Sequence, residues 1–154
     1  MSFGAEIARD LRTRAAGEAS TDAVLRRAVQ ALKDAQPKYD WVGIYLLEGD
    51  ELVLHNYIGT PTEHTRIPVG TGVCGTAVAR GEDLNVPDVS ALDNYLACSV
   101  ETQSEVVVLI VSGDRILGQI DIDSDAKGAF DDEDLRELRA VAEALAETHS
   151  ARRA

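Results

Sequence analysis

The chain has 154 residues, 45% hydrophobic and 27% charged, which predicts one globular domain, residues 1–154, with an apolar core. The 15 Lys and Arg against 27 Asp and Glu give a formal net charge of −12, which would repel phosphate backbones and anionic lipid, so no nucleic acid and no membrane is expected as a partner. The N-terminus lacks the basic start and apolar run of a signal peptide, and no run approaches the roughly 20 apolar residues of a membrane span, so we expect a cytoplasmic protein.

The two cysteines, Cys74 and Cys98, are too few for the disulfide framework of a secreted protein. No Cys-x-x-Cys pair of a metal site is present in the sequence. We therefore expect reduced or redox-active thiols, and neither a metal nor another cofactor.

Two helices are predicted at the N-terminus. The first covers residues 4–16, and the second begins at Ser20 or Thr21, either of which can cap it, and ends at Gln36 before Pro37. Apolar residues recur at helical spacing along the second helix and are expected in the core: Val24, Leu25, Ala28, Val29 and Leu32.

An antiparallel hairpin is predicted next, from strands at residues 41–47 and 51–58. Trp41 and Tyr45 share one face of the first strand, because side chains two positions apart point the same way. They fit either ordinary core packing or the wall of a pocket.

A loop rich in Gly and Pro is predicted over residues 59–75. Its Gly70, Gly72 and Gly75 match the spacing G-x-G-x-x-G, but Pro68 stands where the strand of a dinucleotide-binding motif should lie. The flanking elements also suggest an antiparallel sheet, so a site of that kind is not expected.

A short helix is predicted from Cys74 to Arg80, closed by Gly81. The partial positive charge of a helix N-terminus would favour the thiolate form of Cys74. The alternative is a small buried cysteine that packs the helix onto a sheet.

A short strand at 84–88 and a long connection at 89–103 follow, and a connection of this length is usually functional. The connection carries Cys98. The next strand, 104–111, is apolar on both faces and is therefore expected inside the sheet, covered on both sides.

The strand at 116–123 alternates instead. Four side chains share one of its faces: Leu117, Gln119, Asp121 and Asp123. Carboxylates under cover and near a thiol would be a candidate active site, whereas an open sheet face is the alternative.

The C-terminal helix is predicted after an acidic cluster, residues 131–134, which can cap it and complement its dipole. We interpret this cluster as a solvated helix start and not as a metal site. The apolar stripe of the helix is Leu135, Leu138, Val141, Ala142 and Leu145.

The chain resembles the free methionine-(R)-sulfoxide reductases, a family built on the GAF domain, over about residues 20–147 in uninterrupted order. The motifs that carry the resemblance are Trp41-Val42-Gly43-Ile44-Tyr45, Arg66-Ile67-Pro68-Val69-Gly70-Thr71-Gly72-Val73-Cys74-Gly75, Pro87-Asp88-Val89, Ala97-Cys98, Ser104-Glu105-Val106-Val107 and Gly118-Gln119-Ile120-Asp121-Ile122-Asp123-Ser124. The implied fold is α/β of the α+β type: a roughly six-stranded antiparallel sheet with terminal helices on one face and pocket-forming loops on the other.

The resemblance also implies roles for individual residues. Cys98 would attack the sulfoxide sulfur, and Cys74 would be a second redox cysteine. Glu105, Asp121 and Asp123 would hold the substrate ammonium group and assist protonation of the sulfoxide oxygen. The residues lining the substrate pocket would be Trp41, Tyr45 and Tyr95.

The implied reaction yields methionine and a sulfenic acid on Cys98, which a thioredoxin-like reductant would recycle. His64 stands where the family usually has a third cysteine. A non-catalytic GAF module that binds a small ligand or senses redox state is the alternative, and a homodimer is compatible with either.

The three carboxylates can form one site only if Glu105 points to the same face of the sheet as Asp121 and Asp123. A two-residue turn at 113–114 would place Glu105 opposite Ile122, on the wrong face. The register must therefore shift, either by a three-residue loop or by a bulge, and we predict that Glu105 then lies opposite Asp121.

Overall fold

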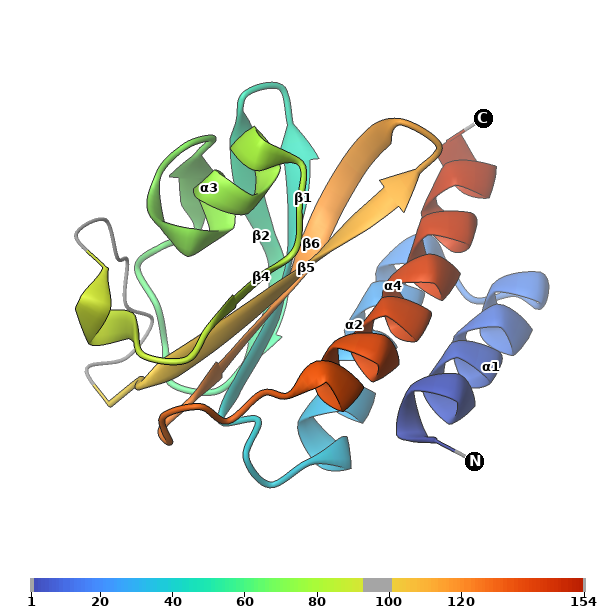
Figure 1. The fold of residues 1–154 in the computed structure, drawn as a ribbon. Coiled ribbons are helices and arrows are strands. Elements are labelled where there is room, and N and C mark those ends of the chain that lie inside the picture. Colours follow the sequence, from blue (N-terminus) through green and yellow to red (C-terminus); the bar gives the residue numbers. More distant parts are fainter. Residues whose placement is uncertain (1, 93–100, 154) are drawn as a thin grey trace.

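A computed structural model describes residues 2–92 and 101–153, drawn in Figure 1. Its elements are α1 (Phe3–Ala16), α2 (Thr21–Ala35), β1 (Trp41–Glu48), β2 (Glu51–Ile58), β3 (Arg66–Pro68), α3 (Gly72–Arg80), β4 (Leu84–Val86), the 3-10 turn η1 (Val89–Ala91), β5 (Ser104–Ser112), β6 (Arg115–Ser124) and α4 (Asp132–Arg153). None of the described helices is long and apolar enough to cross a membrane.

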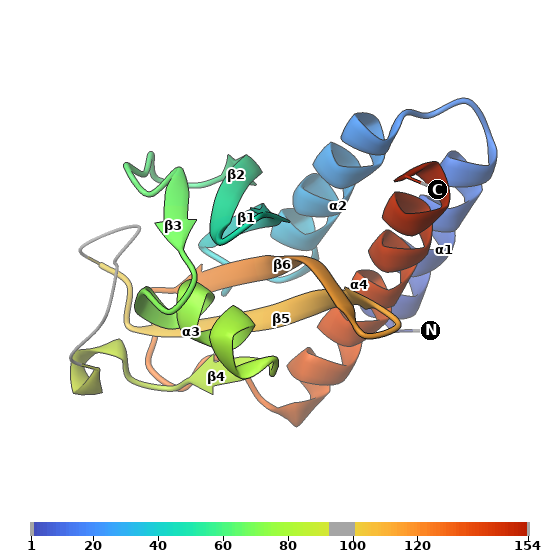
Figure 2. The same cartoon turned by 90° about the horizontal axis from the view of Figure 1, so that it is seen from above.

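The strands form one antiparallel sheet in the order β3-β2-β1-β6-β5-β4. Figure 1 shows α1, α2 and α4 on one face of this sheet and α3 on the other, and Figure 2 shows the same division from above. The predicted α+β architecture, with terminal helices on one face, is confirmed.

The helix-covered face holds the larger apolar core. Ser20 caps α2 by accepting a hydrogen bond from the Ala23 amide at 3.0 Å, and the predicted stripe of α2 is buried. Leu32 is fully buried, as are Ile120 and Ile122 on the facing side of β6. Burial of each such side chain stabilises the fold by about 1.5–3 kcal/mol, so this face anchors the sheet.

The predicted loop at 59–75 is wrong in part, because it contains the short edge strand β3. Pro68 is the last residue of β3, and Pro is tolerated there because an edge strand has one unpaired side. The helix that follows is α3, which ends as predicted at Gly81 in the left-handed conformation, with φ of 66°.

The acidic cluster caps α4 as predicted, and it is exposed except at Asp134. Asp131 and Asp134 cap each other's backbone amides at 2.9 and 3.0 Å. Asp134 is buried rather than solvated, since it accepts hydrogen bonds from Lys38 Nζ and Tyr39 Oη, each at 2.6 Å. Asp134 therefore joins the start of α4 to the segment before β1.

Candidate active site

The face of the sheet opposite the terminal helices gathers the candidate residues in adjacent rows. One row runs from Trp41 on β1 through Asp123 on β6 to Glu105 on β5. The next row holds Asp121 between Gly43 and Val107. Directly paired residues point to the same face, as do residues two apart on one strand, so the three carboxylates and Trp41 share one side of the sheet.

The register between β5 and β6 is set by a bulge. A two-residue turn pairs Ser112 with Arg115, and the register then shifts beyond Val111. The shift that the shared site required is therefore present. The predicted partner is wrong, however: Glu105 lies opposite Asp123, not Asp121.

The bulge also changes the face of the sheet to which Leu117 points. Leu117 was predicted to share the face of Asp121, but it lies in the core under the terminal helices. The extra residue of the bulge breaks the strict alternation of the strand at that point. From Gly118 onward the alternation holds, so Asp121 and Asp123 keep their predicted side.

The carboxylates are not on an open sheet face. Glu105 is 3% exposed, and Asp121 and Asp123 are each 1% exposed. α3 lies over this face, where its Val73, Cys74 and Ala77 pack in an apolar cluster with strand residues of β5. Such burial disfavours charge, so this cluster is costly unless a cation or a proton compensates it.

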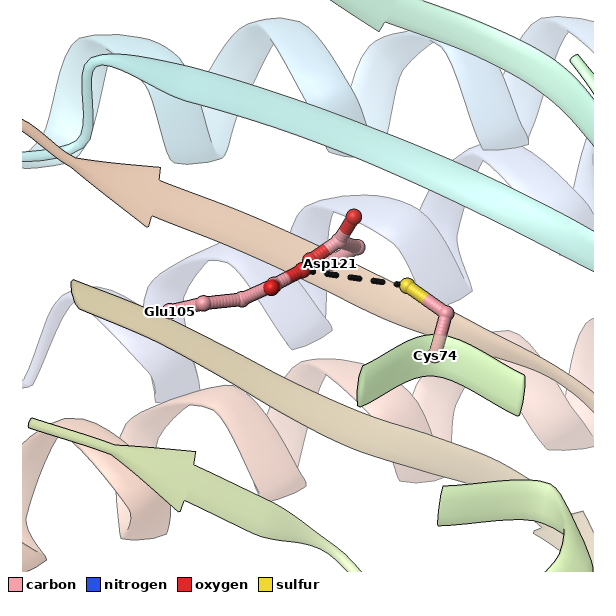
Figure 3. A group of neighbouring side chains, drawn as sticks. All are labelled: Cys74, Glu105 and Asp121. Carbon is pink, nitrogen blue, oxygen red and sulfur yellow. Dashed lines mark hydrogen bonds between the residues drawn. The ribbon is translucent and has the colours of Figure 1, made fainter. Parts of the chain in front are cut away.

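Cys74 lies against the carboxylates. Its Sγ donates to Glu105 Oε2 at 3.8 Å, the contact drawn as a dashed line in Figure 3. The sulfur and one carboxylate oxygen each from Glu105 and Asp121 all lie within 4.8 Å of one another.

Burial raises the pKa of the Cys74 thiol well above its ordinary value, and the nearby charges of Asp121 and Glu105 raise it further. A helix N-terminus favours an anion by only about 0.3–1 kcal/mol, less than burial beside two carboxylates opposes it. The predicted thiolate is therefore wrong for Cys74. The alternative prediction, a small cysteine packing α3 onto the sheet, is the one observed.

Asp121 is the least compensated member of the cluster. Among the described residues, none donates a well-formed hydrogen bond to either of its carboxylate oxygens. Burial raises the pKa of Asp121, and close contacts with Glu105 and Cys74 oppose this only in part. Asp121 is thus suited to hold a proton or to meet a cationic group.

Trp41 and Tyr45 form an aromatic wall beside the carboxylates, and Trp41 is held by contacts with β2 and with the loop that follows it. The Trp41 ring stacks on Tyr57 with centroids 5.4 Å apart, and its Nε1 donates to the Thr60 carbonyl at 3.0 Å. Gly43 makes room for this ring, because a Cβ there would lie 2.4 Å from it. Tyr45 is equally buried beside it, as predicted for a pocket or core residue.

A small cavity of about 10 Å³ opens among these groups, roughly the space of one water molecule. The residues lining it are Tyr45, His64, Ile67, Thr71, Gly72, Val73, Cys74, Glu105 and Asp121. His64 thus lines the same cavity as Cys74, and Tyr45 Oη donates to the His64 carbonyl at 2.7 Å. The segment between β2 and β3, which carries His64, is thereby tied to β1.

Sequence reasoning did not single out Gln119. Its Nε2 donates to the Cys74 carbonyl at 3.0 Å, which ties the first turn of α3 to β6. The alternation of side chains along β6 that predicts the face of Asp121 also predicts the same face for Gln119, so this role could have been expected from the sequence. Two predicted site residues, Cys98 and Tyr95, lie outside the described residues.

Comparison with known proteins agrees with this architecture. The GAF domain model matches residues 20–148. The chain is 42% identical over 137 residues to the free methionine-R-sulfoxide reductase of Escherichia coli (strain K12), covering 89% of this chain and 82% of the relative.

Two solved structures are similar across nearly the whole chain. The free methionine-R-sulfoxide reductase of Neisseria meningitidis, in complex with its substrate, matches with a TM-score of 0.87 and 38% identity, covering 96% of this chain and 89% of that one. The type II free methionine-R-sulfoxide reductase of Thermoplasma acidophilum matches with a TM-score of 0.78 and 38% identity, covering 92% and 94%. The chain belongs to the GAF domain family and, within it, to the free methionine-R-sulfoxide reductases.

Proposed function

We propose that this chain reduces free methionine-R-sulfoxide to methionine, as an oxidoreductase that uses Cys98 as its nucleophile. The observation that carries the proposal is the set of buried carboxylates, Glu105, Asp121 and Asp123, on one sheet face beside Trp41. The likeness to enzymes of that name supports the same reaction.

The carboxylates suit a free amino acid. The ammonium group of such a substrate is a compact cation, and it would relieve the repulsion among buried carboxylates. The buried wall of Trp41 and Tyr45 offers apolar surface for the short thioether chain. A carboxyl whose pKa is raised, as that of Asp121 is, can also supply a proton near neutral pH.

The chemical step forms a bond between the Cys98 sulfur and the sulfoxide sulfur, with a proton taken up by the sulfoxide oxygen. Transfer of that oxygen, as hydroxyl, to the Cys98 sulfur breaks both the sulfur–oxygen bond of the sulfoxide and the new sulfur–sulfur bond, and leaves methionine and a cysteine sulfenic acid. The sulfoxide is thereby reduced by two electrons and Cys98 is oxidised by two. A dithiol reductant then returns Cys98 to the thiol, releasing water and becoming a disulfide.

The recycling step is assigned to a thioredoxin-like dithiol. Cys74 is buried, and its pKa is raised by that burial and by the nearby carboxylates, so little of its nucleophilic thiolate is present at neutral pH. As the second cysteine of the redox set, Cys74 would form a disulfide with the Cys98 sulfenic acid, with loss of water, and a thioredoxin-type reductant would reduce that disulfide, whereas a small dithiol such as dithiothreitol would reduce the sulfenic acid directly. The proposal includes a location in the cytoplasm, where such reductants act, and a homodimer, which sedimentation would test.

The experiment is an assay of methionine formed from free methionine-R-sulfoxide with dithiothreitol. Wild-type protein should give many turnovers, and Cys98→Ser should give none, whereas Cys74→Ser should lose speed mainly with a thioredoxin-type reductant. Absence of methionine from the wild type would favour the non-catalytic module. Equal, mild losses in both variants would assign both cysteines a structural role.

A further inference from the structure

The group formed by Cys74, Glu105 and Asp121 has the donor set of a metal site. Its three candidate ligand atoms come from α3, β5 and β6, and all lie within 4.8 Å of one another. Tetrahedral coordination by Zn²⁺, with bonds of about 2.3 Å to sulfur and 2.1 Å to oxygen, places sulfur and oxygen about 3.6 Å apart. Cys74 Sγ and Glu105 Oε2 are already 3.8 Å apart.

A second observation points to a ligand at this place. Asp121 is 1% exposed, neither of its oxygens receives a well-formed hydrogen bond from a described residue, and it lines the same cavity as Cys74 and Glu105. That cavity, of about 10 Å³, has roughly the room of one water molecule or one ion. A buried carboxylate that is so incompletely compensated is costly, and a cation would offset that cost.

The donor types select the class of cation. A thiolate with two carboxylates suits a borderline-soft ion such as Zn²⁺, whereas Mg²⁺ and Ca²⁺ prefer oxygen ligands alone. Binding must displace the thiol proton of Cys74, so affinity should rise with pH.

We propose that Cys74, Glu105 and Asp121 bind one Zn²⁺ ion, and that the bound ion reversibly blocks the pocket. The inhibition rests on the proposed function, because the ion would occupy the carboxylates that hold the substrate ammonium group. The binding itself does not depend on that function. The step is an exchange without oxidation: a zinc–sulfur bond forms, and the thiol proton goes to solvent.

Binding is tested with Co²⁺ as a spectroscopic probe for Zn²⁺ in the variant Cys98→Ser. Since the chain has 2 cysteines, Cys74 is then the sole thiol. We expect one Co²⁺ per chain with a sulfur-to-cobalt charge-transfer band, displaced by Zn²⁺. Adding Cys74→Ser should remove both the band and the stoichiometric Zn²⁺ binding.

The carboxylate contribution is tested in the same background. Asp121→Asn should weaken Zn²⁺ binding by at least ~10-fold, because it removes one anionic ligand. Asp88→Asn, a surface carboxylate on another segment, is the matched control and should leave the affinity unchanged. Absence of the charge-transfer band, or unchanged Zn²⁺ affinity in Asp121→Asn, would overturn the proposed site.

Inhibition is measured separately by single-turnover formation of methionine from pre-reduced protein, since thiol reductants bind Zn²⁺ themselves. Zn²⁺ should slow the wild type by at least ~10-fold and a chelator should reverse it, whereas the Zn²⁺-dependent slowing should be lost in Cys74→Ser relative to its own metal-free rate. Equal slowing in Cys74→Ser would overturn inhibition through this site. A protein that forms no methionine but shows the cobalt band would contradict the proposed function and leave the metal site standing.

Discussion

Glu105 on β5 stands directly opposite Asp123 on β6, although the two-residue turn that joins their strands would place it opposite Ile122. The bulge at Leu117 makes this difference. It brings buried carboxylates from two strands onto one face while keeping Ile120 and Ile122 in the core under the terminal helices. With the two-residue turn, the bulge accommodates the extra residue of β6 and so lets Glu105 face Asp123.

Deleting Leu117 should leave the candidate site in place. Ile116 already pairs with Val111 and Gly118 with Ile110, so the shortened strand can pair without a bulge while Glu105 stays opposite Asp123. The deletion should then cost about as much as Leu117→Ala, about 2–4 kcal/mol for the core side chain that is lost. Urea unfolding followed by circular dichroism compares the two, and a deletion that prevents folding would contradict this account of the register.

Gly43→Ala should disturb the pocket wall. Its Cβ would lie 2.4 Å from the Trp41 ring, so the ring must move off β1. Trp41 is the only tryptophan, hence its fluorescence reports the shift directly. We expect a changed emission spectrum and a KM for the sulfoxide raised by roughly 10-fold, equivalent to about 1.4 kcal/mol of lost binding.

Gly17→Ala serves as its control, because a Cβ there would meet its nearest atom at an ordinary 3.5 Å. It should leave both the spectrum and KM unchanged. An unshifted spectrum in Gly43→Ala would show that Gly43 does not set the ring position.

Tyr39→Phe should destabilise the fold in a pH-dependent way. Burial alone would raise the pKa of Asp134, but hydrogen bonds from Lys38 and Tyr39 outweigh it and hold the pKa below the ordinary 3.8. A carboxyl with a lowered folded-state pKa stabilises the fold above its unfolded pKa, and this stability is lost as pH falls through the folded pKa. The variant should therefore cost about 2 kcal/mol at pH 7.

The cost of Tyr39→Phe should shrink as the pH falls below the ordinary pKa of 3.8 and through the lowered folded-state pKa of Asp134, because Asp134 is then protonated in both states. Urea unfolding across pH measures this dependence. Tyr57→Phe is the control, since its hydroxyl makes no hydrogen bond within the described residues, and it should change stability by less than about 0.5 kcal/mol. A cost for Tyr39→Phe that is independent of pH would rule out the pairing with ionised Asp134.

Alternation along β6 was enough to predict which side Asp121 and Asp123 occupy, and the helical stripe of α2 was enough to predict its buried face. The bulge could not be read from the sequence, because a two-residue turn at Gly113 is itself regular and the extra residue acts only through pairing. β3 was missed because it has only 3 residues and ends in Pro68.

The chemistry of Cys74 was mispredicted for a related reason. Its place in the first turn of α3 is local information and favours a thiolate. Its carboxylate neighbours come from β5 and β6, and only the packing of α3 on the sheet brings them together. The effect of the carboxylates on β5 and β6 on the Cys74 thiol therefore outweighs the effect of the helix N-terminus.

The protonated, buried state of Cys74 predicts slow chemical labelling. In Cys98→Ser at pH 7, iodoacetamide should modify Cys74 at least ~100-fold more slowly than in the same chain unfolded in urea, because both access and the thiolate fraction are low. Mass spectrometry over time measures the rate. Similar rates in folded and unfolded protein would contradict the described burial.

The claim that Glu105, Asp121 and Asp123 form an ammonium site is tested most directly by comparing free methionine-R-sulfoxide with its N-acetyl derivative, which lacks the cation. Loss of one partner of a buried charge pair costs about 2–5 kcal/mol, so kcat/KM should fall by at least ~30-fold for the N-acetyl compound. Asp123→Asn should narrow this difference. Equal kcat/KM for the two compounds with the wild type would contradict the ammonium site and, with it, the proposed specificity for a free amino acid.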